Sequence, residues 1–135
     1  MSSRRKSREC ALQMLYAADN CRLPEGNSDF WFKEHFPEGE AYKAFALAIF
    51  NGVCLKRVEI DALIEQYAKN WNLERMAAVD RNIIRLAAYE IMDMPETPIN
   101  VIIDEAVEIS KKYSTADSGK FVNGILDKLK AVRNK

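Results

Sequence analysis

Glycine and proline are scarce in this sequence, with five Gly and four Pro among 135 residues. Helices tolerate few of either, so the composition favours helical structure. No segment approaches the roughly 18 consecutive apolar residues that a membrane span needs, which argues against a transmembrane protein. Polar side chains at Arg8, Glu9 and Gln13 interrupt the apolar residues near the start, so we expect no signal peptide.

Cysteine is also scarce, and the three present, Cys10, Cys21 and Cys54, are widely spaced. The sequence has no C-x-x-C pair and no cysteine–histidine spacing that suits zinc. We therefore expect reduced thiols that act as small core residues, in a cytoplasmic protein without a metal site.

Residues typical of catalysis are lacking as well. The single histidine, His35, lies in an aromatic-rich acidic segment and is interpreted as a surface or partly packed residue. No Walker A loop, dinucleotide-binding glycine motif or nucleophile elbow occurs. Asp104 and Glu108 are one helical turn apart, but no further ligand lies nearby, so a solvated acidic helix start is the simpler interpretation. The sequence predicts no catalytic residue, no cofactor and no enzymatic activity.

The formal net charge is zero, but the charges are unevenly placed. Residues 1–22 carry five basic and two acidic side chains, and residues 111–135 carry seven and two. The intervening residues 23–110 hold an excess of eight acidic side chains. If the two ends meet in the fold, they form one basic surface, which is typical of a polyanion site. Alternatively, the lysines from residue 128 onward only complement a helix dipole, but this does not explain the early arginines.

Apolar residues recur at helical spacing, and no segment alternates convincingly as a strand would. Helices are predicted at about residues 4–20, 28–36, 40–70, 79–92 and 99–113, with a last helix through 121–132 and a short turn possible near 71–77. Gly52, within the longest helix, indicates a close packing contact or a bend. The predicted fold class is all-α, with six to seven helices built as helical bundles.

Along one stripe of the first predicted helix, the residues change from arginine to apolar. Arg4 and Arg8 share this stripe with Leu12, Leu15 and Tyr16, so we expect the helix start to overhang the core and the arginines to project from it. Positive charge at a helix start is unfavourable by about 0.3–1 kcal/mol per charge. A cluster placed against this preference favours a functional role, and fraying of the first turn is the alternative.

Four segments, in their order and spacing, resemble the NusB family of transcription antitermination factors. They are RRKSRECALQMLY (4–16), VDRNIIRLAAYEI (79–91), PINVIIDEAVEISKKY (98–113) and DSGKFVNGILDKL (117–129). The KFVNG stretch in the last segment is the most specific. Only residues 20–70 look like generic helices.

The resemblance implies one NusB-like unit over residues 1–135, with two packed helical-bundle subdomains at about 1–72 and 73–135. It implies binding of a boxA-type single-stranded RNA in nascent ribosomal RNA, together with NusE, a small-subunit ribosomal protein. The implied complex helps RNA polymerase to read through terminators. The resemblance implies no catalysis and no cofactor, and it allows a homodimer.

Residue by residue, the resemblance assigns RNA phosphate contacts to Arg4, Arg5 and Arg8. Lys120 and Phe121 match a lysine–phenylalanine pair beside the RNA. A lysine next to an aromatic ring suits backbone neutralisation with base stacking, where each stacked base contributes about 1–3 kcal/mol. Phe121 also fits the apolar stripe of the last helix, so a core position is an equal alternative.

A role facing the protein partner is implied loosely for Asp80, Arg81 and Arg85. Internal salt bridges between helices explain these residues equally well, because they flank an apolar stripe.

Two other functions are compatible with the sequence. The RNA-binding domain of ribosomal RNA cytosine methyltransferases also resembles NusB, but the chain stops at Lys135 without a methyltransferase domain, so we expect a freestanding factor. The second is a non-catalytic protein–protein adaptor whose basic ends contact an acidic partner. Dependence on RNA sequence would distinguish the RNA-binding factor from the adaptor.

Overall fold

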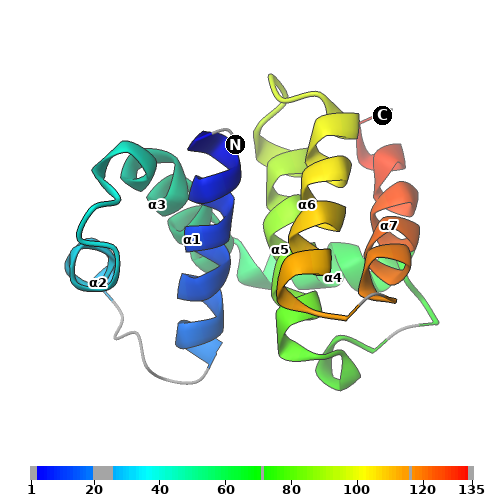
Figure 1. The fold of residues 1–135 in the computed structure, drawn as a ribbon. Coiled ribbons are helices and arrows are strands. Elements are labelled where there is room, and N and C mark those ends of the chain that lie inside the picture. The colour runs from blue at the N-terminus through cyan, green and yellow to red at the C-terminus, as the bar shows by residue number, and fades with distance from the viewer. Residues whose placement is uncertain (1–2, 20–25, 71, 116, 134–135) are drawn as a thin grey trace.

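The computed structural model describes residues 3–19, 26–70, 72–115 and 117–133 (Figure 1). Within these ranges the chain forms seven α-helices and no strand. The helices are α1 (Ser3–Asp19), α2 (Ser28–His35), α3 (Glu40–Leu55), α4 (Arg57–Tyr67), α5 (Ala78–Asp93), α6 (Ile99–Tyr113) and α7 (Ser118–Leu129). Short 3-10 turns follow at Leu73–Arg75 and Lys130–Val132. The predicted all-α fold of six to seven helices is confirmed.

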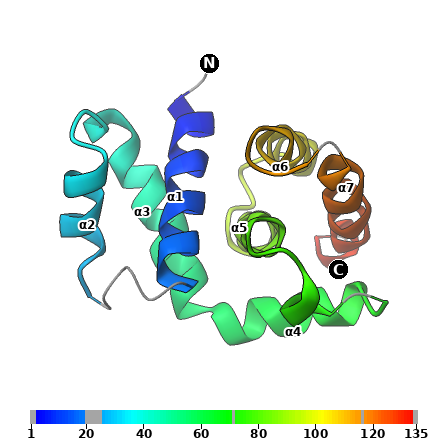
Figure 2. The same cartoon turned by 60° about the horizontal axis from the view of Figure 1, so that its bottom comes forward.

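The helices lie on both sides of α1. Figure 1 shows α2 and α3 on one side of α1 and α5, α6 and α7 on the other. In the turned view of Figure 2, α4 runs from the end of α3 across to α7, and it packs on both α5 and α7. No helix in the described part of the chain is long and apolar enough to cross a membrane.

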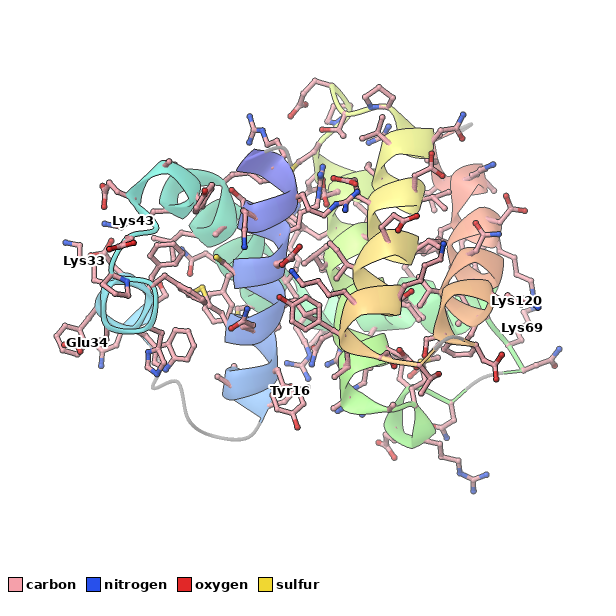
Figure 3. The ribbon with its side chains drawn as sticks, in the orientation of Figure 1. Tyr16, Lys33, Glu34, Lys43, Lys69 and Lys120 are labelled. Atoms are coloured by element: carbon pink, nitrogen blue, oxygen red, sulfur yellow. The ribbon has the colours of Figure 1, made fainter. Side chains whose placement is uncertain are left out.

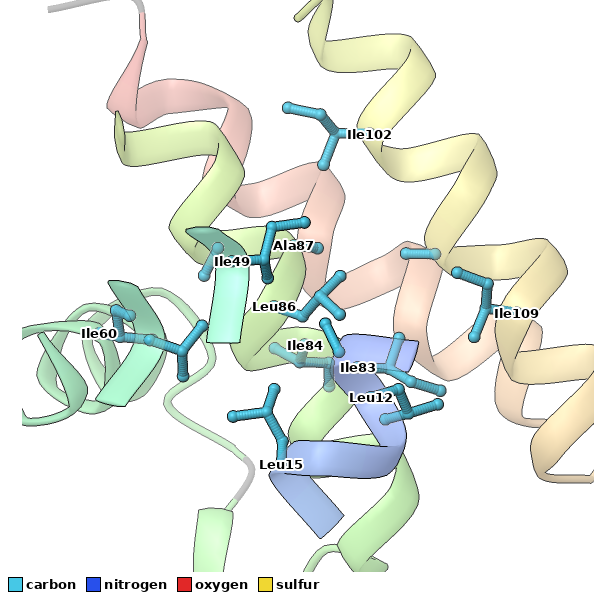
Figure 4. Close-up of a cluster of buried hydrophobic side chains, with 14 of the residues drawn as sticks. Leu12, Leu15, Ile49, Ile60, Ile83, Ile84, Leu86, Ala87, Ile102 and Ile109 are labelled. Carbon is cyan, nitrogen blue, oxygen red and sulfur yellow. The ribbon is translucent and has the colours of Figure 1, made fainter. Parts of the chain in front are cut away.

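The interior is organised around α5. This helix packs against α1, α3, α4, α6 and α7, and it is buried on nearly every side, which marks it as the central helix. Figure 4 shows its side chains among those of four neighbouring helices. The labelled residues are Leu12, Leu15, Ile49, Ile60, Ile83, Ile84, Leu86, Ala87, Ile102 and Ile109. They belong to one continuous hydrophobic core.

The single long helix predicted for residues 40–70 is wrong. Two helices occupy this range, and the chain turns at Lys56, whose backbone N–H donates to the carbonyl of Gly52. The Lys56 ammonium lies 2.6 Å from the Asp93 carboxylate at the end of α5. The turn directs the buried side of α4, with Ile60 and Ile64, toward α5 and α7. Tertiary packing therefore overrides the helical period that continues through the junction.

Gly52 makes the close packing contact that the sequence predicted. A Cβ added at this position would lie well inside van der Waals contact with the ring of Tyr89 on α5. The absence of a side chain lets α3 and α5 approach closely at this point.

Replacing Gly52 by alanine should lower the free energy of unfolding by about 1–3 kcal/mol, because the new methyl group must displace the Tyr89 ring. Urea denaturation followed by circular dichroism measures the change. The matched control is Gly124→Ala on α7, where an added Cβ meets no atom within 4 Å. The control should be neutral or stabilised by up to about 1 kcal/mol. Equal stability of the two variants would contradict the close contact.

The two cysteines in the described residues differ in their burial. Cys10 is buried in the core as expected, whereas Cys54 is exposed, which corrects the prediction that it is a core residue. Cys54 lies on the outward side of α3, next to the exposed Leu55. Cys21 lies outside the described residues.

The division into two subdomains near residue 72 stays a proposal. α4 lies before that boundary in the sequence, yet it packs on α5 and α7 as well as on α3.

Candidate nucleic-acid interface

The arginines at the start of α1 occupy different environments. Arg4 is exposed, and its guanidinium carbon lies 3.8 Å from the centroid of the Phe45 ring, a cation–π contact. Arg5 is partly buried. Its Nε donates a hydrogen bond of 2.8 Å to the Glu105 carboxylate, and its Nη2 contacts the same carboxylate. This hydrogen-bonded pair raises the pKa of Arg5. Arg4 thus keeps its charge at the surface, whereas the charge of Arg5 is neutralised by Glu105.

Arg8 does not project from the fold, contrary to the sequence expectation. Its Nε donates to one carboxylate oxygen of Glu90 on α5 and its Nη2 donates to the other, both at 2.8 Å. Its Nη1 lies 3.4 Å from Glu105 on α6. The side chains of Arg8 and Glu90 are 4% and 1% exposed. Arg8 contacts α5 and α6, so the stripe shared with Leu12 still points inward at Arg8, and only Arg4, one turn earlier, is exposed.

A second polar contact joins α1 to α6. Glu9 is buried, and its Oε1 accepts hydrogen bonds from the Lys112 ammonium at 2.8 Å and the Tyr113 hydroxyl at 2.9 Å. Burial, together with the neighbouring Glu9 carboxylate, raises the pKa of Tyr113. The hydrogen bond to Glu9 also raises the pKa of Lys112. The Lys112 ammonium is therefore paired with a buried carboxylate, so less of its charge is available to an external anion.

Lys120 presents an uncommitted positive charge at the start of α7. It is exposed and makes no ion pair or hydrogen bond with the residues that the structure describes. The Lys111 side chain packs beside Gly119, 3.7 Å from the position that a Cβ would take there. Lys111, at the end of α6, is a second exposed lysine beside the start of α7, and it also pairs with Glu108 at 3.4 Å. In Figure 3, Lys69 lies at the same corner as Lys120.

Phe121 lies at the edge of the core rather than inside it. Its ring is partly buried and packs against the core, while the adjacent Val122 is fully buried. Val122 therefore takes the interior position of the α7 stripe. Phe121 lines a pocket of about 400 Å³, whose wall also includes Asn70, Asn72 and Asp80. Whether its ring stacks on RNA stays a prediction, and its place at a pocket wall favours that role over a core role.

Asp80, Arg81 and Arg85 make contacts within the chain. Arg85 donates through Nε and Nη2 to the two oxygens of Asp61 on α4, at 2.8 and 3.0 Å. Arg81 donates to the Leu73 carbonyl at 3.2 Å and to Asp19 at 3.3 Å. Arg81 and Arg85 thus make internal salt bridges, to Asp19 and Asp61, which the sequence left open as an alternative. Asp80 accepts a hydrogen bond from the Ser118 hydroxyl at 3.2 Å. A role of the three residues toward a partner stays a prediction.

Asp19, at the end of α1, is the acceptor that gathers these contacts. Its carboxylate accepts from Asn82 at 2.8 Å, Arg57 at 3.1 Å and Arg81. Desolvation alone would raise the pKa of Asp19, but the Asn82 hydrogen bond and the nearby arginines outweigh it and lower that pKa. No local pattern in the sequence indicates this role, because the donors come from helices distant in the sequence.

The basic residues at the end of the chain do not form one surface with those at its start. Arg133 donates to backbone carbonyls around the end of α5 and is not available to an anion. Lys130 pairs with Asp127 at 3.0 Å, and Lys135 lies outside the described residues. In Figure 1 the start of α1 and the end of α7 lie at the same end of the molecule, with α6 between them.

The predicted RNA-contacting residues therefore form two positions. Arg5, in the first turn of α1, contacts Glu105 near the middle of α6, whereas Lys120 and Phe121 lie in α7 shortly after α6 ends. The eight residues from Glu105 to Tyr113 rise about 12 Å along the α6 axis, so the two positions are separated by at least about that distance. A single strand of several nucleotides is needed to reach both.

An aromatic cavity, which sequence reasoning missed, opens beside the lower half of α1. It measures about 540 Å³ and is lined by Tyr16, Trp31, His35, Val79 and Tyr113 among others. Tyr16 was expected to be buried with Leu12, but its side chain is 42% exposed, because this face of α1 borders the cavity. Trp31 and His35 stack with ring centroids 3.7 Å apart. Exposed aromatic surface of this kind is typical of protein interfaces.

No group of three or more potential ligands in the described residues could hold a metal ion.

Comparison with known proteins gives a consistent result. The family model described as "NusB family" matches residues 5–131. The chain is 45% identical to the transcription antitermination protein NusB of Elusimicrobium minutum, over 98% of this chain and 96% of that protein. It is 47% identical to the protein of the same name from Trichlorobacter lovleyi, over 97% of this chain and 92% of that protein.

Solved structures are similar in fold as well as in sequence. NusB of T. maritima is 36% identical and has a TM-score of 0.81, with 95% of this chain and 90% of that chain covered. A chain in the crystal structure of the antitermination factors NusB and NusE in complex with dsRNA is 28% identical. Its TM-score is 0.80, and 98% of each chain is covered.

Proposed function

Because this chain belongs to the NusB family, we propose that it is an RNA-binding transcription antitermination factor that acts with NusE. The similarity extends over more than nine-tenths of both curated relatives, which carry the antitermination name. This favours an antitermination factor over the RNA-binding domain of a ribosomal RNA methyltransferase. The solved complex of NusB and NusE with RNA supports both partners.

The observation that carries the RNA site is the pairing of Lys120 with Phe121. An exposed lysine that has no partner among the described residues adjoins a half-buried aromatic ring at the wall of a pocket. The lysine neutralises a phosphate while the ring stacks on a base. Lys111 adds a second positive charge at the same end, and Arg4 provides a further phosphate contact at the other. Arg5 contributes less because Glu105 neutralises it, and Arg8 holds the fold together rather than the RNA.

The remaining roles follow from this function. The chain performs no catalysis and uses no cofactor, and it works in the cytoplasm where nascent ribosomal RNA and RNA polymerase meet. NusE docks on exposed surface that includes the aromatic cavity at Tyr16, since aromatic side chains are enriched at protein interfaces. A homodimer through the same surface would compete with NusE.

Fluorescence anisotropy with a labelled boxA-type RNA tests the function. The control is a scrambled RNA of the same composition, and each RNA is measured with and without NusE. Preference for the boxA sequence, tightened by NusE, is the expected result. Equal weak binding of both RNAs, unchanged by NusE, would contradict the function and favour a protein–protein adaptor.

Replacing Lys120 by alanine should weaken RNA binding and reduce the dependence of log affinity on log salt concentration by about 0.7, the value for one lost phosphate contact on a single strand. Anisotropy titrations at several salt concentrations measure the slope. Lys128→Ala, an exposed lysine two turns later on α7, is the matched control and should leave the slope unchanged. Equal slopes for the two variants would place the phosphate contact elsewhere.

A further inference from the structure

The turn between α3 and α4 carries the most exposed large apolar side chains of the described residues. Leu55 is 82% exposed and Val58 is 83% exposed. Leu55 also lines a cavity of about 500 Å³, whose wall includes Ala18 and the buried Phe50. Single exposed apolar residues are common on protein surfaces, but apolar residues grouped beside a cavity indicate a site of interaction.

The outer face of α4 extends this apolar surface. Figure 2 shows α4 along one edge of the molecule, with the other helices on one side of it. Ile60 and Ile64 are buried on that side. The outer face consists of the five exposed residues of the helix, which are Val58, Glu59, Ala62, Glu65 and Gln66.

Helical spacing fixes the order of these residues across the outer face. Each residue turns an α-helix by about 100°, so Val58 and Ala62 lie about 40° apart on the exposed arc. The same spacing places Glu65 at one edge of the arc and Glu59 at the other. The outer face is therefore an apolar strip with a carboxylate on each side.

These two carboxylates are unpaired, whereas the basic residues at the turn are paired. Lys56 lies 2.6 Å from Asp93, and Arg57 lies 3.1 Å from the carboxylate at the end of α1. Glu59 and Glu65 form no hydrogen bond or ion pair with the residues that the structure describes. Glu59 adds a longer-range attraction to Lys56, whose ammonium Asp93 already holds. The strip thus presents negative charge that the fold leaves uncompensated.

We propose that the outer face of α4 is a docking site for a segment of another protein that forms a basic amphipathic helix. The apolar residues of that helix cover Leu55, Val58 and Ala62. Its lysines or arginines face Glu59 and Glu65, as the flanking charges of paired helices do. The cavity beside Leu55 has room for one large apolar side chain as an anchor.

The charges distinguish this partner from other occupants. A second copy of the chain would place the same carboxylates against one another, and like charges across an interface repel. RNA is itself negatively charged and would be repelled in the same way. The exposed Lys69 lies beyond the end of α4, at the corner where Figure 3 shows Lys120. RNA therefore meets positive charge at that corner and negative charge along α4, so the two surfaces are separate.

A fluorescein-labelled model peptide tests the chemistry of the site. The outer face from Val58 to Gln66 extends about 12 Å along α4, so a helical peptide of about 14 residues covers it. The peptide carries leucines at helical spacing with lysines on both sides of them. One control peptide has glutamate in place of each lysine, and another has serine in place of each leucine. In anisotropy titrations, wild-type protein should bind the lysine–leucine peptide about tenfold more tightly than either control peptide.

A double variant at the turn tests the apolar contact. Leu55→Ser combined with Val58→Ser should weaken binding of the lysine–leucine peptide about tenfold, because these side chains are covered only in the complex. Both side chains are exposed in the free protein, so the variant should unfold at the wild-type temperature. Sedimentation velocity of wild-type protein and of this variant shows whether the same face joins two copies of the chain.

Charge reversal tests the two edges of the strip. Glu59→Lys combined with Glu65→Lys should reverse the preference, so that the glutamate–leucine peptide binds more tightly than the lysine–leucine peptide. Asp104→Lys combined with Glu108→Lys makes the same change of charge at exposed positions on α6 and is the matched control. It should keep the wild-type preference. Thermal unfolding confirms that each variant is folded.

Three results would overturn the proposal. The first is equal binding of the three peptides by wild-type protein, a comparison that needs no variant. The second is an equal loss of binding in the two charge-reversal variants, which would mean general attraction of a cation to an acidic surface. The third is a wild-type dimer that separates in the serine variant, which would assign the face to a second copy of the chain.

Discussion

Replacing Arg8 by alanine should lower the free energy of unfolding by about 3–5 kcal/mol, the usual effect of removing one partner of a buried ion pair. Glu90, 1% exposed, would then be a buried carboxylate without its guanidinium. Glu105 would keep Arg5 but lose Arg8. The loss would be a large share of the total stability of a domain of this size. Urea denaturation with a reported midpoint and slope measures it.

Arg4→Ala is the control for charge removal at the start of α1. Arg4 is exposed and contacts only the face of Phe45, so its replacement should cost no more than about 1 kcal/mol. The double variant Arg8→Met with Glu90→Gln removes both charges and should recover much of the lost stability. An Arg8→Ala protein as stable as Arg4→Ala would refute the buried pair, and Arg8 would return to the candidate RNA contacts.

Replacing Arg133 by alanine should lower the free energy of unfolding by about 2–4 kcal/mol, because a charged group that satisfies several backbone carbonyls would be lost. Its guanidinium donates to the carbonyls of Glu90, Ile91, Met94 and Thr97, at 2.6 to 3.1 Å. These carbonyls lie at the end of α5 and in the loop that follows it, where helical partners run out; those of Glu90 and Met94 also accept the backbone N–H groups of Met94 and Thr97. The positive charge also complements the negative end of the helix dipole. Thermal and urea unfolding measure the change.

A lysine at this position should recover only part of the loss, because one ammonium cannot reach carbonyls that the flat guanidinium contacts from several sides. Lys130→Ala is the matched control, since Lys130 makes only a local pair with Asp127, and it should change stability by less than about 1 kcal/mol. A small effect of Arg133→Ala would mean that water replaces the guanidinium at these carbonyls.

The helices predicted from the sequence were those with a strong apolar period. The stripes of α5, α6 and α7 have the spacing that packing requires, and their bounds are close to the predicted ones. The junction at Lys56 left no such signal, because the apolar period continues across it. What turns the chain there is packing of α4 on α5 and α7, together with the ion pair to Asp93. Neither is visible in a local window of sequence.

The candidate site was harder to predict because charge was taken as a sign of exposure. Arg8 lies on the same stripe as Leu12, so the helical spacing indicated a buried side chain. Its charge was taken to indicate an exposed one. Its acceptor Glu90 lies 82 positions away, beyond any local pattern. Lys120 and Phe121 were found through family resemblance, but the distinction between Phe121 and the buried Val122 required the packed structure.

The buried arginine of α1 also bears on how the chain is made. Synthesis starts at the amino terminus, so α1 leaves the ribosome long before the carboxylates of Glu90 and Glu105 have been joined to the chain. Until then the side of α1 that carries Arg8, Leu12 and Leu15 cannot be enclosed without an unpaired charge. The interior is therefore completed only when the later helices emerge. A chain stalled before α5 would expose the apolar side of α1, with Leu12 and Leu15, and exposed apolar surface of this kind makes incomplete chains prone to aggregation.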